Sequence, residues 1–362
     1  MSTMREILVD SASRLFGDVC TRDAFARAEE GLWQADLWAT LEAAGLPNAT
    51  LSETRGGAGA DLGDALAVIR EMGAACVPAP LAETMLAELA LSAAGLAPRP
   101  GPLTIGPVLT GDAPSLVRRG DDWEISGTLH RIPWARHANA VVVVAQTAGL
   151  WATAVVDRFV IAVRGSNYAN EPRDDVRLDA LRLPQDAVAV GGGNLTAEMV
   201  LSLGALFRSA AMAGALTRVL GMTLTYAQER EQFGRPIGKF QSIQHQIAVL
   251  ASQVAAASAA ADAVFAAATS GQARFEIAAA KVRIGEAAGI AAGIAHQVHA
   301  AMGFTHEHAL HRSTRRLWSW RDEFGSEAEW AAWIGQVVSR LGARGLWPFL
   351  TSAPKEIPAA TD

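Results

Sequence analysis

The hydrophobic pattern of this chain changes its period twice, and that change limits the folds that the chain can adopt. Across residues 5–96 apolar side chains recur every three or four positions, for example in DAFARAEEGLWQADLWATLEAAGL, which is the period of an amphipathic helix. Across 100–194 the period falls to two, in DWEISG, NAVVVVAQ, LWATAVVD, RFVIAVRG and VRLDALRL, which predicts short strands. From 195 to about 346 the pattern is helical again and rich in alanine.

This order of helices, strands and helices predicts an α+β chain with several domains. A length of 362 residues exceeds what one compact core usually holds. We predict an N-terminal helical domain (1–100), a middle small β-barrel or sandwich (101–194), a C-terminal four-helix bundle (195–346) and a tail (347–362).

Composition and charge exclude several classes of protein. The net charge of −6 comes without any sustained basic run, so neither a nucleic-acid groove nor an anionic membrane patch is expected. Half of the residues are hydrophobic, which favours a globular and oligomeric protein over a disordered one. The two cysteines, Cys20 and Cys76, form no disulfide or metal-binding pattern. The N-terminus resembles neither a secretory signal nor a transit peptide, so we expect a cytoplasmic protein.

Three glycines in the C-terminal region lie at intervals of four. Gly285, Gly289 and Gly293 leave one face of a helix nearly bare, which would allow another backbone to approach closely. A membrane span is the competing interpretation of that spacing. Because Lys281 and Glu286 interrupt the same stretch, we expect no membrane span there.

Five of the eight histidines fall within residues 296–311. His296 and His299 would share a helix face, yet no carboxylate or cysteine completes a recognisable set of ligands. We therefore predict no metal site.

Two motifs in the C-terminal region carry a specific resemblance. The stretch YAQEREQFGRPIGKFQSIQHQIA, which begins at Tyr226, resembles a signature of the flavin-dependent acyl-CoA dehydrogenase family. About fifty residues later, QVHAAMGFTHEHALHRSTRR looks like the second helical signature of that family. A weaker similarity extends to ETRGGAGADL and to WEISG with ANAVVVVA, so the resemblance covers nearly the whole chain. It implies the same domain order that the periodicity predicts.

The resemblance also implies an FAD site that is shared between subunits. Arg230 stands where the family has an arginine that contacts the FAD pyrophosphate held mainly by a neighbouring subunit, and a guanidinium suits that role because it stays charged. Gln232 and Phe233 match positions near the diphosphate and adenosine of FAD. Gln241 matches a further adenosine-side position. In this interpretation Gly234 and Pro236 end the helix so that Arg230 and Phe233 can project across a subunit boundary.

The second signature implies further FAD contacts and shows a departure. Gln297 matches a glutamine that faces FAD. The family usually has two glycines shortly after it, which let the backbone approach the diphosphate, whereas this chain has Ala300 and Ala301. The added methyl groups imply an FAD that is shifted, weakly held, or bound at only some sites of the oligomer.

The implied reaction is α,β-desaturation of an acyl-CoA thioester, with electrons leaving to an electron-transfer flavoprotein. It needs a carboxylate that removes the α-proton. At the usual position of that glutamate this chain has Phe324, and the position used by other members is Gly204. Glu323 is adjacent to Phe324 and is the remaining candidate base, although a solvated surface charge is the simpler interpretation.

A second departure lies in the middle domain. RIPWAR (131–136) replaces the Trp-Ile-Ser/Thr element of the family. Trp134 either takes over packing against the flavin or is an ordinary buried tryptophan.

These features leave three hypotheses. The first is an FAD-dependent acyl-CoA dehydrogenase, in a homotetramer, with Glu323 as an unconventional base. The second is a non-catalytic or half-site subunit of a heterotetramer, which donates Arg230 and Phe233 to the FAD of a second dehydrogenase subunit, as in paired subunits acting on steroid side chains. The third is a flavin oxidase or monooxygenase on the same fold.

Overall fold

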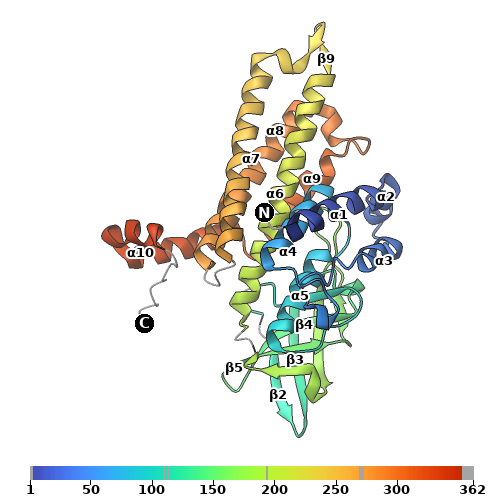
Figure 1. Ribbon diagram of the computed structural model, residues 1–362, viewed down its shortest axis with the longest axis vertical. Helices are drawn as coiled ribbons and strands as arrows, with labels where there is room; N and C mark the ends of the chain where they lie inside the picture. Colours follow the sequence, from blue (N-terminus) through green and yellow to red (C-terminus); the bar gives the residue numbers. More distant parts are fainter. Residues whose placement is uncertain (1–2, 110, 113, 193–194, 269–272, 353–362) are drawn as a thin grey trace. The chain divides into compact units, whose positions relative to one another are not determined.

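The computed structural model describes residues 3–109, 111–112, 114–192, 195–268 and 273–352. The chain divides into two compact units. One unit comprises residues 1–72 and 77–207, and the other comprises 73–76 and 208–362. Figure 1 shows the order of the elements along the chain.

The first unit begins with helices and ends with a sheet. Its helices are α1 (Thr3–Val19), α2 (Arg22–Glu29), α3 (Ala35–Ala43), α4 (Leu62–Ala75) and α5 (Leu81–Ala94). The stretch 23–46, which has a continuous helical period, is broken between α2 and α3, where Gly31 adopts a φ of 76°. The Thr21 hydroxyl accepts a hydrogen bond from the Ala24 N–H and caps α2 at its start.

The strands of this unit form one eight-stranded sheet. They are β1 (Leu103–Gly106), β2 (Ser115–Arg119), β3 (Asp122–Pro133), β4 (Ala140–Thr147), β5 (Leu150–Val156), β6 (Val160–Val163), β7 (Arg173–Leu183) and β8 (Val188–Val190). Their order is β6-β7-β3-β2-β4-β5-β8, and β1 pairs with β4 in parallel. Strand β4 is buried along almost its whole length, which explains its run of four valines. Helix α5 packs on β1, β4 and β5.

Trp134, at the end of β3, lies inside this unit. Its side chain is 7% exposed, and its ring lies edge-on to Trp33, with 6.4 Å between the ring centroids. The His137 ring in turn stacks on Trp33 at 5.0 Å. The structure therefore favours the interpretation of Trp134 as an ordinary buried tryptophan.

The second unit is a bundle of long helices. Helix α6 (Ala197–Glu229) enters it from the first unit, and α7 (Gln241–Ala268), α8 (Arg274–His299), α9 (Leu310–Trp320) and α10 (Glu327–Thr351) follow. Helices α7, α9 and α10 all pack against α8 (Figure 1). Helix α10 extends past the predicted end of the bundle at 346, because Phe349 is buried and meets Phe275 edge-to-face at 4.9 Å.

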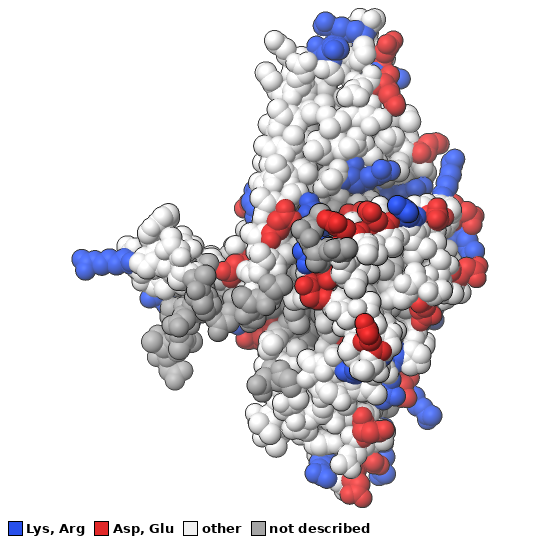
Figure 2. Space-filling view, in the orientation of Figure 1, with Lys and Arg blue, Asp and Glu red and all other residues white. Residues whose placement is uncertain are grey.

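Helices α6 and α7 are both long and apolar enough to cross a membrane by length and composition alone. In α6 the apolar segment is 78% buried within the protein, which is typical of a core helix, whereas in α7 only 28% is buried. Figure 2 shows a wide area without charged side chains over α7. The sequence test for a membrane span considered the glycine spacing of α8 and missed α7, which carries the exposed apolar surface.

Candidate functional site

The break after α6 is a β-hairpin. Strands β9 (Glu231–Gln232) and β10 (Arg235–Pro236) pair antiparallel, and Phe233 and Gly234 form the two-residue turn between them. Both turn residues have positive φ, 52° and 76°, which is the pattern of a type I′ turn. Glycine adopts this conformation freely, whereas it is strained for phenylalanine. The Phe233 side chain is 93% exposed at the tip of the hairpin.

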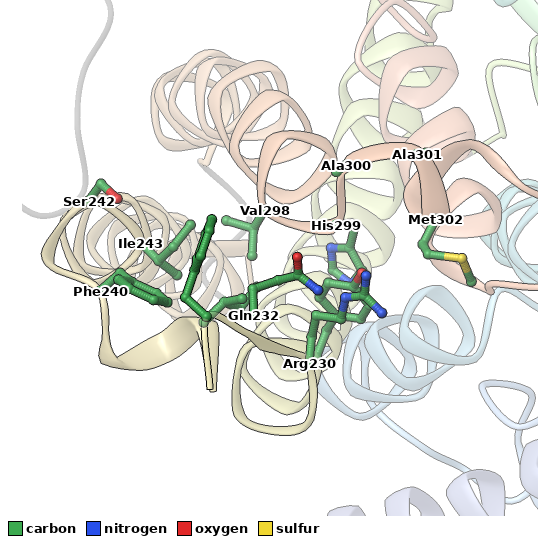
Figure 3. Close-up of a pocket in the computed structure, with 13 residues that line it drawn as sticks. Arg230, Gln232, Phe240, Ser242, Ile243, Val298, His299, Ala300, Ala301 and Met302 are labelled. Carbon is green, nitrogen blue, oxygen red and sulfur yellow. The ribbon is translucent and has the colours of Figure 1, made fainter. Parts of the chain in front are cut away.

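A cavity of about 510 Å³ lies between this hairpin and the end of α8 (Figure 3). Roughly this size suits a small-molecule or cofactor ligand. Arg230, Gln232 and Phe233 meet Ala300 and Ala301 there, so five positions named from the sequence face one space. The cavity is further lined by Tyr226, Ile237, Phe240, Ser242, Ile243, Val298, His299 and Met302.

Two predicted FAD contacts do not line this cavity. Gln241 is the first residue of α7 and is exposed, while its neighbours Phe240 and Ser242 face the cavity. Gln297 is exposed on α8, and the next two residues, Val298 and His299, face the cavity in its place.

Ala300 keeps a backbone conformation that normally requires glycine. It ends α8 with φ 50° and ψ −137°, where the Cβ of an L-amino acid is strained. The backbone at this position therefore follows the glycine pattern although the side chain does not. Ala301 is not among the residues with positive φ.

The sequence analysis assigned no binding role to the aromatic side chains in and around this cavity. The Tyr226 ring stacks on the His299 ring with 4.4 Å between centroids, and His308 lies 4.6 Å from His299 on centroids. Nearby, the Arg235 guanidinium lies over the Phe240 ring at 4.4 Å. The histidines of 296–311 were weighed only as metal ligands, and among the described residues no group of three or more metal-binding side chains occurs.

The histidines at the end of α8 are neutral near pH 7. Burial lowers the pKa of His299, and the neighbouring His308 and His296 act in the same direction. Burial also lowers the pKa of His308. These rings therefore act as uncharged hydrogen-bonding groups, and Arg230 supplies the positive charge of the cavity.

Glu323, the predicted catalytic base, forms a buried ion pair. Helix α9 ends at Trp320, so Glu323 lies in the following turn and is not constrained by helical geometry. Its carboxylate accepts a hydrogen bond from Arg208 Nε at 2.7 Å, and both side chains are buried. The interpretation of Glu323 as a solvated surface charge is therefore wrong. Phe324 is also buried, and the Arg208 guanidinium lies 5.6 Å from its ring centre.

The turn that carries Glu323 is fixed on one face of α8. Lys281 is fully buried, and its Nζ donates to the carbonyl oxygens of Trp320, Arg321 and Gly325 within 3.3 Å. Burial lowers the pKa of Lys281 to about 8, although nearby carboxylates, Glu323 first among them, oppose that shift.

The next two turns of the same face carry glycines, which are covered by an ion pair. The Glu327 carboxylate lies over Gly285, and the guanidinium of Arg321, which pairs with Glu327, lies over Gly289. The expectation that a backbone approaches these glycines is wrong, because they accommodate charged side chains. Gly293 has no neighbouring heavy atom within 4 Å at the position of a Cβ.

Comparison with known proteins identifies the class. The family model described as acyl-CoA dehydrogenase, C-terminal domain, matches residues 191–327, and the model described as acyl-CoA dehydrogenase, N-terminal domain, matches residues 2–97. The chain has an acyl-CoA dehydrogenase fold, and it belongs to the acyl-CoA dehydrogenase family of flavoprotein oxidoreductases.

Particular relatives narrow the comparison. The acyl-CoA dehydrogenase IpdE2 of Mycobacterium tuberculosis is 30% identical over 317 residues, covering 86% of this chain and 89% of the relative. A variant of the Tcur3481-Tcur3483 steroid ACAD superposes with a TM-score of 0.83 at 25% identity, covering 93% of this chain and 98% of that chain. The ChsE4-ChsE5 complex from M. tuberculosis superposes with a TM-score of 0.85 at 22% identity, covering 95% and 99%, and this likeness shows the fold alone.

The residues of the cavity are chemically suited to part of an FAD molecule. Arg230 offers a permanent cation for a diphosphate, and Phe233 and Phe240 offer aromatic surfaces for a ring system. His299 Nε2 is a buried polar atom without a hydrogen-bond partner among the described residues. The methyl group of Ala300 leaves a ligand less room to approach the backbone there. The residues on the hairpin side of the cavity therefore suit FAD better than those at the end of α8.

Proposed function

We propose that this chain is an FAD-binding subunit of an acyl-CoA dehydrogenase, and that the catalytic carboxylate of the assembly belongs to a partner subunit. The observation that carries this proposal is the cavity that brings Arg230, Gln232 and Phe233 together with the end of α8. The ion pair between Glu323 and Arg208 supports the second half of the proposal, because a carboxylate held by a buried guanidinium is a poor proton acceptor.

Each residue has a distinct task in this proposal. Arg230 binds the diphosphate of FAD through charge-assisted hydrogen bonds, and the amide of Gln232 adds a neutral polar contact. Phe233 packs against the adenosine side, and the hairpin turn leaves its ring 93% exposed and edge-on to the Phe240 ring at 6.1 Å. When bound, FAD would supply the acceptor for the hydride of the β-carbon of an acyl-CoA thioester. This chain holds the cofactor, and the partner removes the α-proton.

Exposed apolar surface supports an assembly. A phenylalanine with 93% exposure and a long helix with only 28% of its apolar segment buried both require cover from outside this chain. The likeness to the Tcur3481-Tcur3483 steroid ACAD supports a heterotetramer with a second dehydrogenase subunit and a bulky acyl-CoA such as a steroid thioester. We further propose an electron-transfer flavoprotein as electron acceptor and the cytoplasm as location.

A second candidate function is desaturation by this chain alone, in a homotetramer, with Glu323 as the base. It is favoured by the position of Glu323 in a turn next to Phe324, where the carboxylate is not aimed by a helix. In this version Glu323 must leave Arg208 before it can take the α-proton, so its pairing works against the reaction.

Flavin content distinguishes the two functions. We expect the chain purified alone to be colourless and to gain FAD when it is co-expressed with a partner dehydrogenase subunit, whose flavin an acyl-CoA then bleaches. Arg230→Gln should lower the flavin content of the assembly. Lys239→Gln, which removes an exposed cation near the hairpin that does not line the cavity, should leave it unchanged.

Two outcomes contradict the half-site proposal. One is a yellow homotetramer that an acyl-CoA bleaches and whose bleaching is abolished by Glu323→Gln although that variant stays folded and yellow, since that places the base in this chain. The other is an assembly whose flavin content is the same with and without Arg230→Gln.

A further inference from the structure

His299 has a fixed tautomer and one unused hydrogen-bonding atom. Its Nδ1 lies 2.7 Å from the carbonyl oxygen of Ala295, one turn earlier in α8. A carbonyl only accepts hydrogen bonds, so Nδ1 carries the proton and Nε2 carries a lone pair. That Nε2 is buried and has no hydrogen-bond partner among the described residues. A buried acceptor without a partner is costly, and such atoms in native proteins call for an explanation.

The imidazole ring that carries Nε2 belongs to the wall of the cavity. His299 lines the same cavity as Arg230 and Gln232, and Figure 3 shows its ring among their side chains. The Tyr226 ring covers one face of the imidazole at an interplanar angle of 25°. A lone pair on Nε2 lies in the plane of the ring, so a donor has to approach the ring edge, a direction that stacking on the face does not occupy.

Because Nε2 is a hydrogen-bond acceptor, it can pair only with the part of a nucleotide that carries hydrogen-bond donors. Phosphate oxygens at neutral pH are acceptors, so they can pair with Arg230 but cannot pair with a neutral Nε2. Ribose hydroxyl groups and the amino group of adenine are neutral donors that can. We propose that His299 is a nucleotide-binding residue, whose Nε2 accepts a hydrogen bond from a hydroxyl or amino donor on the adenosine part of the ligand in this cavity. This assignment rests on the proposed FAD site.

Binding measurements on the flavin-free form of the assembly test the assignment. The probes are ADP, which carries the donors, and inorganic pyrophosphate, which carries none. We expect His299→Phe, which keeps a stacking ring, to weaken ADP about tenfold and to bind pyrophosphate as the wild type does. His299→Asn should behave in the same way, because its amide can still donate to the Ala295 carbonyl. Equal thermal unfolding temperatures confirm that both variants fold.

Three analogues then identify the donor. We expect one of 2′-deoxy-ADP, 3′-deoxy-ADP and IDP to bind the wild type about tenfold more weakly than ADP, and that difference to vanish in His299→Phe. If the wild type binds all three as tightly as ADP, the assignment is wrong.

Arg230→Gln separates failure of this assignment from failure of the proposed function. If Arg230→Gln weakens both ADP and pyrophosphate while His299→Phe binds ADP normally, only the assignment of His299 is overturned. If neither substitution changes the binding of either probe, the cavity is not the nucleotide site, and both the assignment and the proposed function are overturned.

Discussion

Replacing Ala300 by glycine should stabilise the protein, which is unusual for a substitution that removes a methyl group. The backbone there has φ 50° and ψ −137°, and holding a non-glycine residue in such a region costs on the order of 1–3 kcal/mol. Glycine gives back roughly 0.4–1 kcal/mol through the greater freedom of the unfolded chain. The Ala300 side chain is exposed, so little packing is lost. We expect a net gain of about 1 kcal/mol in the free energy of unfolding.

Ala301→Gly is the matched control. Ala301 is also exposed and lines the same cavity, but it is not among the residues with positive φ, so glycine there should destabilise by about 0.5–1 kcal/mol. Denaturant unfolding of both variants gives the two free energies. Opposite signs at adjacent alanines support the reasoning. A loss of stability in Ala300→Gly, or an equal gain in both variants, would show that this backbone is not strained.

Three further predictions concern the buried charges and the hairpin. Glu323→Gln removes the carboxylate that pairs with the buried Arg208 guanidinium, so we expect a loss of roughly 3–5 kcal/mol in denaturant unfolding, against roughly 1 kcal/mol or less for Asp179→Asn, which breaks an exposed arginine pair. The folded pKa of Lys281, about 8, lies below its ordinary 10.5, so between these values the unfolded chain binds more protons and stability rises with pH. That rise is about 3 kcal/mol, and Lys281→Met should remove it from the pH dependence of unfolding. Phe233→Asn relieves a positive φ at a type I′ turn, so we expect the unfolding free energy to rise by about 1 kcal/mol while the flavin content of the assembly falls.

Each of these predictions can fail in a specific way. Equal losses in Glu323→Gln and Asp179→Asn would mean that the buried pair is no stronger than a surface pair. An unchanged rise of stability above pH 8 in Lys281→Met would assign the titration to other groups. A Phe233→Asn variant that keeps its flavin would remove Phe233 from the site.

Periodicity predicted the longer elements because their burial follows the repeat of the backbone. All five predicted strand segments lie in β3, β4, β5, β6 and β7. Strands β1, β2 and β8 have three to five residues and were not predicted, whereas β6 is equally short but lies within the apolar run RFVIAVRG. The break between α2 and α3 was missed because apolar residues keep their helical spacing through Gly31.

The candidate site was predictable where a motif is local in sequence. Arg230, Gln232 and Phe233 lie within four residues of one another, and the cavity contains all three. The hairpin itself was not foreseen, because Gly234 and Pro236 are also typical of a helix end. His299 could have been singled out only with knowledge of its contact to Ala295, since a histidine in a helix has no sequence signal for its tautomer.

The buried environment of Glu323 could not be predicted from the sequence. Its neighbours in RDEFGSEAE are polar, which suggests a solvated charge, but its partner Arg208 is 115 positions away. Lys281, 42 positions before it, fixes the turn around this buried carboxylate through three carbonyl oxygens. A pairing across that distance depends on how the helices pack, and packing leaves no local pattern.

Backbone strain is found both at the cavity and at the position expected for the base. Phe233 and Ala300 both hold backbone conformations that favour glycine, and both line one cavity. Strain persists where the surrounding structure enforces it, and it gathers at sites that hold ligands. At the position expected for the base, Phe324 also has a positive φ, 55°, but two buried charges there are paired or hydrogen-bonded: Glu323 with Arg208, and Lys281 with carbonyl oxygens. The pairing of the buried carboxylate, and not the distribution of strain, is therefore what weighs against Glu323 as a base.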